Sequence, residues 1–181
     1  MNDQANMQAN GTVQVRIETE RGGITVAVDA NRAPGTAANF LRYVDEGFYD
    51  GGRFHRTVTM SNQPNDAVRI EVAQAGANPD RDGERHAPLA LERTAATGLA
   101  HRDGTISMAR FTPDSAVSDF FVCIGDQPAL DFGGTRNPDG QGFAAFGQVV
   151  EGMDVVRAIQ TAPAEGQRLT PPVAIRSARR V

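Results

Sequence analysis

Apolar and polar residues alternate in two stretches near the start of the chain, at residues 13–19 and 24–29. Successive side chains of a strand point to opposite faces, so this alternation predicts two strands that each have one buried face. The residues between them, Arg-Gly-Gly at positions 21–23, are typical of a tight connection. We therefore expect an antiparallel hairpin that packs one face on the core.

A helix is predicted next, because apolar residues recur at helical spacing after Pro34. Thr36 is in the position of an N-terminal cap, and Gly47 is a residue at which the helix can end. The apolar stripe comprises Ala38, Phe40, Leu41, Val44 and Phe48. A stripe of this kind normally packs on the core, and the alternative is that it lines a ligand site. A second, shorter helix is expected at residues 153–159.

Short strands dominate the rest of the chain. We expect them at residues 53–56, 70–76, 104–110, 118–123, 143–149 and 173–179. Polar, turn-rich stretches at residues 57–65 and 78–85 are interpreted as exposed loops. Many short strands, few helices and a strand near each end favour a closed antiparallel barrel, because closure leaves no exposed sheet edge. The predicted fold class is therefore mainly β.

Length and composition fit one domain. The chain has 181 residues, of which 40% are hydrophobic, which is enough for one sizeable core and too little for two large domains. We assign the barrel domain to residues 12–181 and interpret residues 1–11 as a flexible tail. The first ten residues are polar and lack the features of a signal peptide or a membrane span. A leader removed from a longer precursor is the alternative.

The charge balance narrows the choice of partners. Acidic residues outnumber basic ones, 22 against 18, and no run of like charges could follow a phosphate backbone. We therefore expect no nucleic-acid partner and no membrane partner. The single cysteine, Cys123, cannot form an internal disulfide, which fits the cytoplasm. A periplasmic location is the alternative if a leader was removed.

Two motifs point to a known family. Phe-His-Arg stands at residues 54–56, and Gln-Ala-Gly at residues 74–76 ends a strand in which Ile70, Val72 and Gln74 share one face. Together they resemble the signature of the cyclophilin-type peptidyl-prolyl cis-trans isomerases, in which a Phe-His-Arg strand precedes a strand that ends in Gln-Gly-Gly. Residues 104–110 and 118–123 are similar to two further strands of that family. The resemblance runs from residue 13 to residue 181.

The resemblance implies an eight-stranded antiparallel barrel capped by two helices, with the active groove on its outer face. It also implies that the protein accelerates rotation about X-Pro bonds of proline-containing polypeptides and so assists protein folding. That rotation must break amide resonance, a barrier of about 18–20 kcal/mol. It needs an apolar slot for the proline ring and a donor aimed at the prolyl nitrogen, and no nucleophile, metal or cofactor. We expect the enzyme to be a monomer.

Arg56 and Gln74 are the expected catalytic residues, since both match catalytic positions of the family. Arg56 would donate to the prolyl nitrogen, and Gln74 would hold the neighbouring backbone. The alternatives are a surface arginine in an ion pair and a solvated strand glutamine. His55 is interpreted as structural, because the reaction moves no proton. The positions that match the proline pocket are Val72, Ala109, Phe121, Leu130 and Phe143.

Several positions depart from the family pattern. Glu71 stands where the family has a pocket Phe, Arg110 where it has Asn, Asp119 where it has Gln, and Phe143 where it has His. We place Glu71, Arg110 and Asp119 at the groove rim. Strand alternation turns the Glu71 carboxylate away from Arg56, since Glu71 and Gln74 lie on opposite faces. The departures leave open a second reading, a module that binds prolyl peptides with weak or lost isomerase activity.

Overall fold

The computed structural model describes residues 10–181, so most of the expected tail at residues 1–11 lies outside the described residues. The strands are β1 (Thr12–Thr19), β2 (Gly22–Asp29), β3 (Arg53–Val58), β4 (Val72–Gly76), β5 (Thr105–Met108), β6 (Phe120–Cys123), β7 (Ala145–Glu151), β8 (Ala164–Glu165) and β9 (Arg168–Arg180). The helices are α1 (Pro34–Asp45), α2 (Thr94–Thr97) and α3 (Met153–Gln160), with 3₁₀ turns η1 (Pro79–Glu84) and η2 (Pro128–Leu130).

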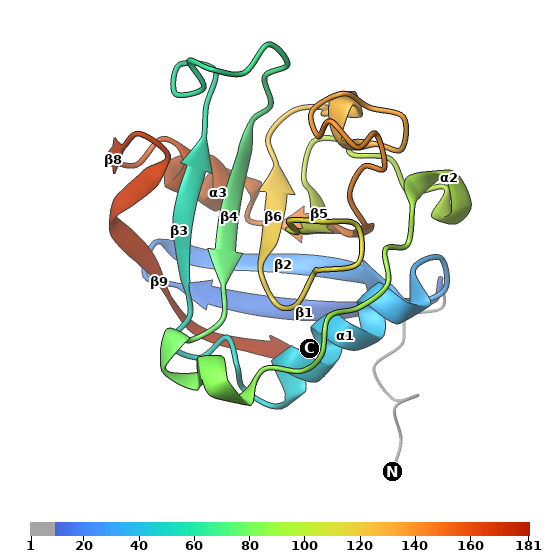
Figure 1. Ribbon diagram of the computed structural model, residues 1–181. Coiled ribbons are helices and arrows are strands. Elements are labelled where there is room, and N and C mark those ends of the chain that lie inside the picture. Colours follow the sequence, from blue (N-terminus) through green and yellow to red (C-terminus); the bar gives the residue numbers. More distant parts are fainter. Residues whose placement is uncertain (1–9) are drawn as a thin grey trace.

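The sheet closes on itself. Its strands follow the order β1-β2-β7-β5-β6-β4-β3-β9-β8, and β1 also pairs with β9. All the pairings are antiparallel, so eight strands form a closed barrel and the short β8 is attached to β9. Figure 1 shows β3, β4 and β6 side by side on one wall of this barrel. The prediction of a closed eight-stranded antiparallel barrel is confirmed.

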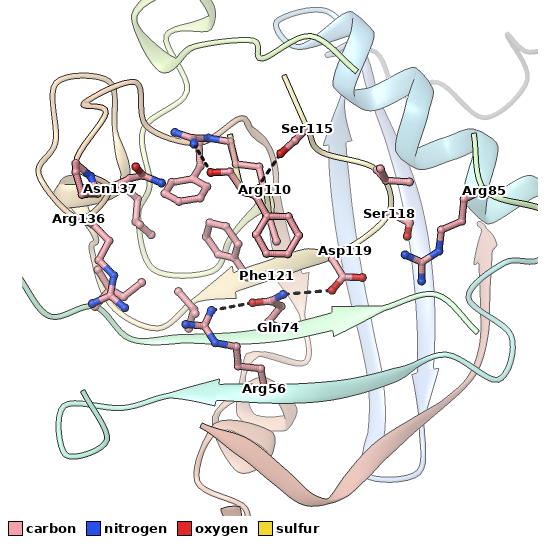
Figure 2. A pocket seen from close by; sticks show the side chains of 18 residues that line it. Arg56, Gln74, Arg85, Arg110, Ser115, Ser118, Asp119, Phe121, Arg136 and Asn137 are labelled. Atoms are coloured by element: carbon pink, nitrogen blue, oxygen red, sulfur yellow. Dashed lines mark hydrogen bonds between the residues drawn. The ribbon is translucent and has the colours of Figure 1, made fainter. Parts of the chain in front are cut away.

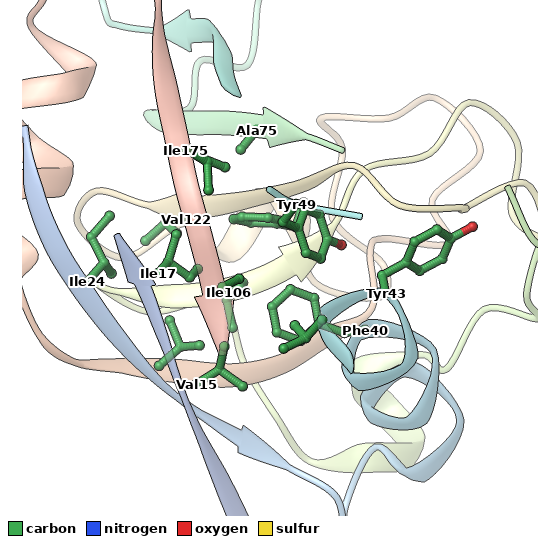
Figure 3. Close-up of a cluster of buried hydrophobic side chains, with 14 of the residues drawn as sticks. Val15, Ile17, Ile24, Phe40, Tyr43, Tyr49, Ala75, Ile106, Val122 and Ile175 are labelled. Carbon is green, nitrogen blue, oxygen red and sulfur yellow. The ribbon is translucent and has the colours of Figure 1, made fainter. Parts of the chain in front are cut away.

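Alternation along the strands separates two apolar clusters. The larger cluster fills the barrel and includes Val122 of β6 and Phe40 of α1 (Figure 3). Phe120 of β6 belongs to it too, and its ring meets the Phe40 ring edge to face. The smaller cluster lies on the other face of β4 and β6, where Val72 and Phe121 are 2% and 4% exposed. The lumen is therefore occupied by the protein's own side chains, as in other small barrels, and a ligand site must lie outside it.

Two helices cover the barrel, as expected. Helix α1 lies against β2 and β9, and α3 contacts β2, β3 and β4 (Figure 1). The predicted N-terminal cap of α1 was wrong, whereas Gly47 follows the end of the helix as expected. The helix begins at Pro34, and Thr36 is a buried residue inside it whose hydroxyl donates to the Glu92 carboxylate. The last helical residue is Asp45, before Gly47 with its positive φ.

Three further features differ from the predicted pattern. The last strand begins at Arg168, five residues before the expected start, because β8 pairs with it as a hairpin. The stretch at residues 78–85 contains η1, which has no buried residue. Helix α2 was not predicted. Within residues 10–181 we find no helix with the length and hydropathy needed to cross a membrane.

Candidate active site

A cavity of about 600 Å³ opens on the outer face of the wall formed by β3, β4 and β6 (Figure 2). It gathers nine of the ten residues that the sequence singled out: Arg56, Val72, Gln74, Ala109, Arg110, Asp119, Phe121, Leu130 and Phe143. The tenth, Glu71, is not among the lining residues. The motifs therefore converge on one groove, although their separate roles stay predictions.

The middle of the groove is an apolar slot. Phe121 forms its floor, and the Phe143 ring meets it edge to face with ring centroids 5.6 Å apart. Val72 and Leu130 are almost fully buried beside them. The slot is therefore bounded by two rings at a right angle and by aliphatic walls, a shape that suits a small apolar ring.

Three polar and aromatic side chains stand in a row across the wall. Arg56 of β3 is the cross-strand partner of Gln74 of β4, which in turn is the partner of Phe121 of β6. The register of β3 shifts between Phe54 and Arg56, so His55 is bulged. Cross-strand partners on one face lie about 4.5–5.5 Å apart, so the Arg56 guanidinium reaches the edge of the slot. Figure 2 shows Arg56 and Gln74 next to Phe121.

The Arg56 guanidinium is held by two glutamines. Its Nη1 donates to Gln74 Oε1 at 2.9 Å, and its Nε and Nη2 donate to Gln167 Oε1 at 3.0 and 2.7 Å. Since arginine has five N–H donors, two remain for a ligand. Burial, followed by the nearby Arg136 guanidinium, lowers the pKa of Arg56. The group stays charged at neutral pH, because arginine is not deprotonated in proteins.

Asp119 fixes the orientation of the Gln74 amide. Gln74 Nε2 donates to Asp119 Oδ2 at 3.2 Å, which turns the amide oxygen toward Arg56. His55 Nε2 lies 3.0 Å from the same carboxylate oxygen. Gln74 keeps one N–H donor and one lone pair, so it can both donate to and accept from a polypeptide backbone. The contact of His55 with Asp119 agrees with its expected structural role.

Glu71 faces away from the groove, as alternation predicts. Its carboxylate accepts a hydrogen bond from Gln160 of α3 at 3.3 Å, and within residues 10–181 no hydrogen bond or ion pair joins it to Arg56. The expected rim position of Glu71 was therefore wrong. Ile70, which is 6% exposed, lines the groove in the place that the sequence left without its aromatic wall.

Arg110 is not an exposed rim charge. Its side chain is 1% exposed and forms a bidentate ion pair with Asp139, with N–O distances of 2.9 and 3.0 Å. It also donates to the Gly142 carbonyl from Nε at 2.9 Å and from Nη2 at 2.6 Å. The guanidinium carbon lies 4.7 Å from the centre of the Phe143 ring. Arg110 thus fastens the loop at residues 131–142 and the aromatic wall of the slot.

The turn-rich stretch that follows β3 builds one end of the groove. Arg136 Nη1 donates to Gln63 Oε1 at 2.6 Å and to the Val68 carbonyl at 2.8 Å, and forms a 3.5 Å ion pair with Asp66. These contacts join two loops that are far apart in the sequence. Sequence reasoning missed Arg136 and Gln167, because neither belongs to a motif and only the tertiary fold brings them to the groove.

A buried polar chain supports the floor. His101 Nδ1 lies 2.7 Å from Asp131 Oδ1, and its Nε2 lies 2.9 Å from Ser107 Oγ. Burial acts to raise the pKa of Asp131, but the hydrogen bonds from His101 outweigh it and hold that pKa below its usual range. The order resembles a hydrolase triad, but Ser107 is fully buried and the His101 ring stacks on Phe121. The chain is therefore a support, and residues 101, 107 and 131 carried no sequence signal for it.

Within the described residues, Cys123 is no candidate nucleophile, and no candidate metal site is found. Burial raises the pKa of Cys123 far above its ordinary value, so its thiol is inert. Within residues 10–181, no three His, Cys, Asp or Glu side chains are grouped in a way that could hold a metal ion.

Comparison with known proteins identifies a family. The family described as "Cyclophilin type peptidyl-prolyl cis-trans isomerase/CLD" matches residues 14–180. A peptidyl-prolyl cis-trans isomerase of Acinetobacter baylyi is 35% identical over 156 residues, which cover 86% of this chain and 76% of that protein. The isomerase cyp18 of Streptomyces antibioticus is 34% identical over 171 residues, which cover 91% of this chain and 96% of the relative.

Solved structures share the fold. A cyclophilin-type isomerase of Cryptosporidium parvum superposes with a TM-score of 0.75 at 19% identity, covering 94% of this chain and 98% of that one. A second structure of it, obtained in the presence of the dipeptide Ala-Pro, gives a TM-score of 0.73 at 20% identity and covers 93% of this chain and 98% of that one.

Proposed function

The chain belongs to the cyclophilin-type peptidyl-prolyl cis-trans isomerase family, and from that premise we propose how its own residues rotate an X-Pro bond. It is an isomerase that accelerates this rotation in protein folding, like the relatives that carry the same name. The single observation that carries the assignment of roles is the fixed Arg56 guanidinium at the edge of the apolar slot, with two donors left over.

The slot binds the ring of the proline. Burying a ring between Phe121 and Phe143 contributes hydrophobic free energy and fixes one side of the X-Pro bond. As the amide twists, resonance is lost and the prolyl nitrogen gains a basic lone pair. A donor from Arg56 meets that lone pair only in the twisted state, so the hydrogen bond stabilises the transition state more than either ground state.

Gln74 holds the backbone next to the rotating bond. Asp119 and Arg56 orient its amide before the substrate arrives, so little side-chain entropy is lost on binding. Rotation then proceeds around an anchored ring and an anchored backbone segment. None of these steps transfers a proton, which agrees with the engagement of His55 by Asp119.

The substrate class is proline-containing polypeptide. The shape of the slot supports this choice, and the related fold has been studied with the dipeptide Ala-Pro. A monomeric state and a cytoplasmic location stay predictions, with the periplasm as the alternative location.

The roles are tested with Arg56→Ala and Arg56→Lys. Both variants should lose at least about a hundredfold in kcat/KM on an X-Pro peptide, because a lysine cannot reproduce the planar, fixed donors. Arg176→Ala, an exposed change on β9, is the matched control and should keep full activity. Thermal melts show whether the Arg56 variants stay folded. Full catalytic efficiency in folded Arg56→Ala protein would remove Arg56 from the mechanism.

A further inference from the structure

A second cavity, of about 620 Å³, continues the groove past Asp119. The two cavities meet at Asp119 and Arg85, which line both of them. Figure 2 places Arg85 and Ser118 on the side of Asp119 that faces away from the slot. The buried Ser118 hydroxyl has no hydrogen-bond partner among the described residues.

The second cavity carries uncompensated positive charge. Its two acidic residues are already engaged, Asp82 by Arg85 at 2.7 Å and Asp119 by His55 at 3.0 Å. Arg53 and Arg168 also line the cavity, and neither forms an ion pair or a side-chain hydrogen bond within residues 10–181.

Glu165 is the acidic residue that the strand register places beside Arg168. It lies opposite Arg168 in the hairpin of β8 and β9, yet the two side chains form no ion pair. The chain as a whole has a net charge of -4, so the positive charge is a property of this cavity and not of the whole surface.

The rest of the lining is apolar and suits the stem of a side chain. Beside the uncharged polar Thr170, it consists of Ala77, Pro79, Leu169, Pro171 and Pro172 together with Gly76. A carboxylate on a short aliphatic stem matches this combination of apolar lining and two free guanidinium groups, because the stem is buried and the charge is paired.

Strand geometry gives the distance from the slot. Gly76 lies two residues along β4 from Gln74, which is about 7 Å at a rise of about 3.4 Å per residue. Arg53 is the cross-strand partner of Gly76 and lies three residues from Arg56. An extended polypeptide whose proline occupies the slot therefore places a residue two or three positions away in the second cavity.

We propose that this cavity is a specificity site for an acidic side chain two or three residues from the proline, which Arg53 and Arg168 recognise. The proposal rests on the function given above and names its substrate class: acidic proline-containing segments. It assigns Arg53 and Arg168 to substrate selection and not to bond rotation.

The test compares peptides that carry Glu or Gln at positions -3, -2, +2 or +3 from the proline. Turnover and binding of each pair are measured with the wild-type protein, with Arg53→Gln/Arg168→Gln and with Arg21→Gln/Arg176→Gln. The last variant removes the same charge from exposed positions outside both cavities. At one of these positions Glu should exceed Gln in kcat/KM by about three- to tenfold, the range expected for two partly exposed ion pairs.

The advantage of Glu should vanish in Arg53→Gln/Arg168→Gln, survive in the control pair and shrink in high salt. Turnover of the Gln peptides should be the same in all three proteins, which shows that the fold and slot are intact. Equal values for Glu and Gln at every position would overturn the proposal, as would a Glu preference that survives the loss of both arginines. Competition by inorganic phosphate without any Glu preference would mean a site for small anions and would also overturn it.

A failure of the proposed isomerase function can be distinguished from a failure of the specificity site. If no peptide is turned over but the Glu peptide still binds more tightly through Arg53 and Arg168, the isomerase mechanism fails and the specificity site stands.

Discussion

Phe121 and Phe120 are neighbours in sequence but serve different parts of the molecule. Phe121 lies on the outer face of β6 and floors the slot, whereas Phe120 packs inside the barrel against Phe40, Tyr49 and Phe54. Both side chains are almost fully buried. The pair therefore separates the effect of substrate contact from the effect of core packing.

We predict that Phe121→Leu raises KM for an X-Pro peptide several-fold, because the proline ring loses its aromatic floor. Phe120→Leu should leave KM unchanged. Each change should lower the free energy of unfolding by about 1 kcal/mol. Urea denaturation beside steady-state kinetics measures both effects. An unchanged KM in Phe121→Leu would mean that the proline ring binds elsewhere.

A substitution of Glu71 tests whether its charge affects turnover from outside the groove. Its carboxylate accepts from Gln160 and not from Arg56. Glu71→Gln should therefore leave kcat/KM within about twofold of wild type at neutral pH, and wild-type activity should not rise in mild acid. A several-fold gain in Glu71→Gln would show that its charge restrains Arg56 and would favour the binding-module reading for the native chain.

At this scale the sequence predicted the groove residues that belong to motifs, because each motif lies on a strand whose alternation fixes its face. It placed Val72, Gln74 and Phe121 correctly for this reason. The sequence did not predict the side chains that hold the groove residues in place. Gln167 reaches Arg56 only through the β8–β9 hairpin, and the buried state of Arg110 depends on a carboxylate 29 residues away, as their contact shows.

The loop at residues 131–142 is the element that closes the slot. Arg110 attaches it through Asp139 and the Gly142 carbonyl, and Phe143 follows directly. Arg110 lies two residues after the end of β5, so one side chain connects the segment that leaves the barrel wall to the loop. The position of the Phe143 wall therefore depends on the contacts of Arg110.

We predict that Arg110→Ala raises KM about five- to twentyfold with less than a threefold change in kcat, because the aromatic wall loosens while Arg56 stays in place. The free energy of unfolding should fall by up to about 3 kcal/mol. Arg157→Ala is the matched control, since it removes an arginine from an exposed pair with Asp103. A loss confined to kcat would show that Arg110 acts on the rotating bond instead.

Elements were predicted well where the pattern is local. The first hairpin follows from alternation and its glycines, and β1 and β2 do pair antiparallel. Helix α1 begins two residues before Thr36, because the backbone of its first turn is bonded by Glu92, a residue distant in sequence that replaces the expected Thr36 cap. The early start of β9 depends on pairing with β8, and β8 has only two residues, which is too short for an alternation pattern to predict.

For the molecule as a whole, closure of the barrel followed from the number and length of the strands, but the order in which they pair did not. The tertiary fold places the Asp131 carboxylate beside His101, which holds the pKa of Asp131 below its usual value against the effect of burial. A carboxyl with a lowered folded-state pKa contributes stability above its unfolded pKa of about 3.9, and the contribution is lost as the pH falls through the folded pKa.

We therefore predict that Asp131→Asn is less stable than wild type at neutral pH and that the difference shrinks below about pH 4. Urea midpoints across this range measure it. Asp50 and Glu46, whose pKa values are also lowered by their partners, remain in both proteins and cancel in the comparison. A difference that stays constant down to strong acid would show that Asp131 acts by packing and not by its charge.

The central claim is that the groove turns over the X-Pro bond and does not merely bind proline. NMR exchange spectroscopy on a short X-Pro peptide with a catalytic amount of protein tests it most directly, because it reports binding and cis-trans exchange together. We predict exchange far faster than the uncatalysed process, which takes tens of seconds, and a return to the uncatalysed rate with Arg56→Ala. Peptide signals that shift on binding while the exchange rate stays uncatalysed would contradict the account.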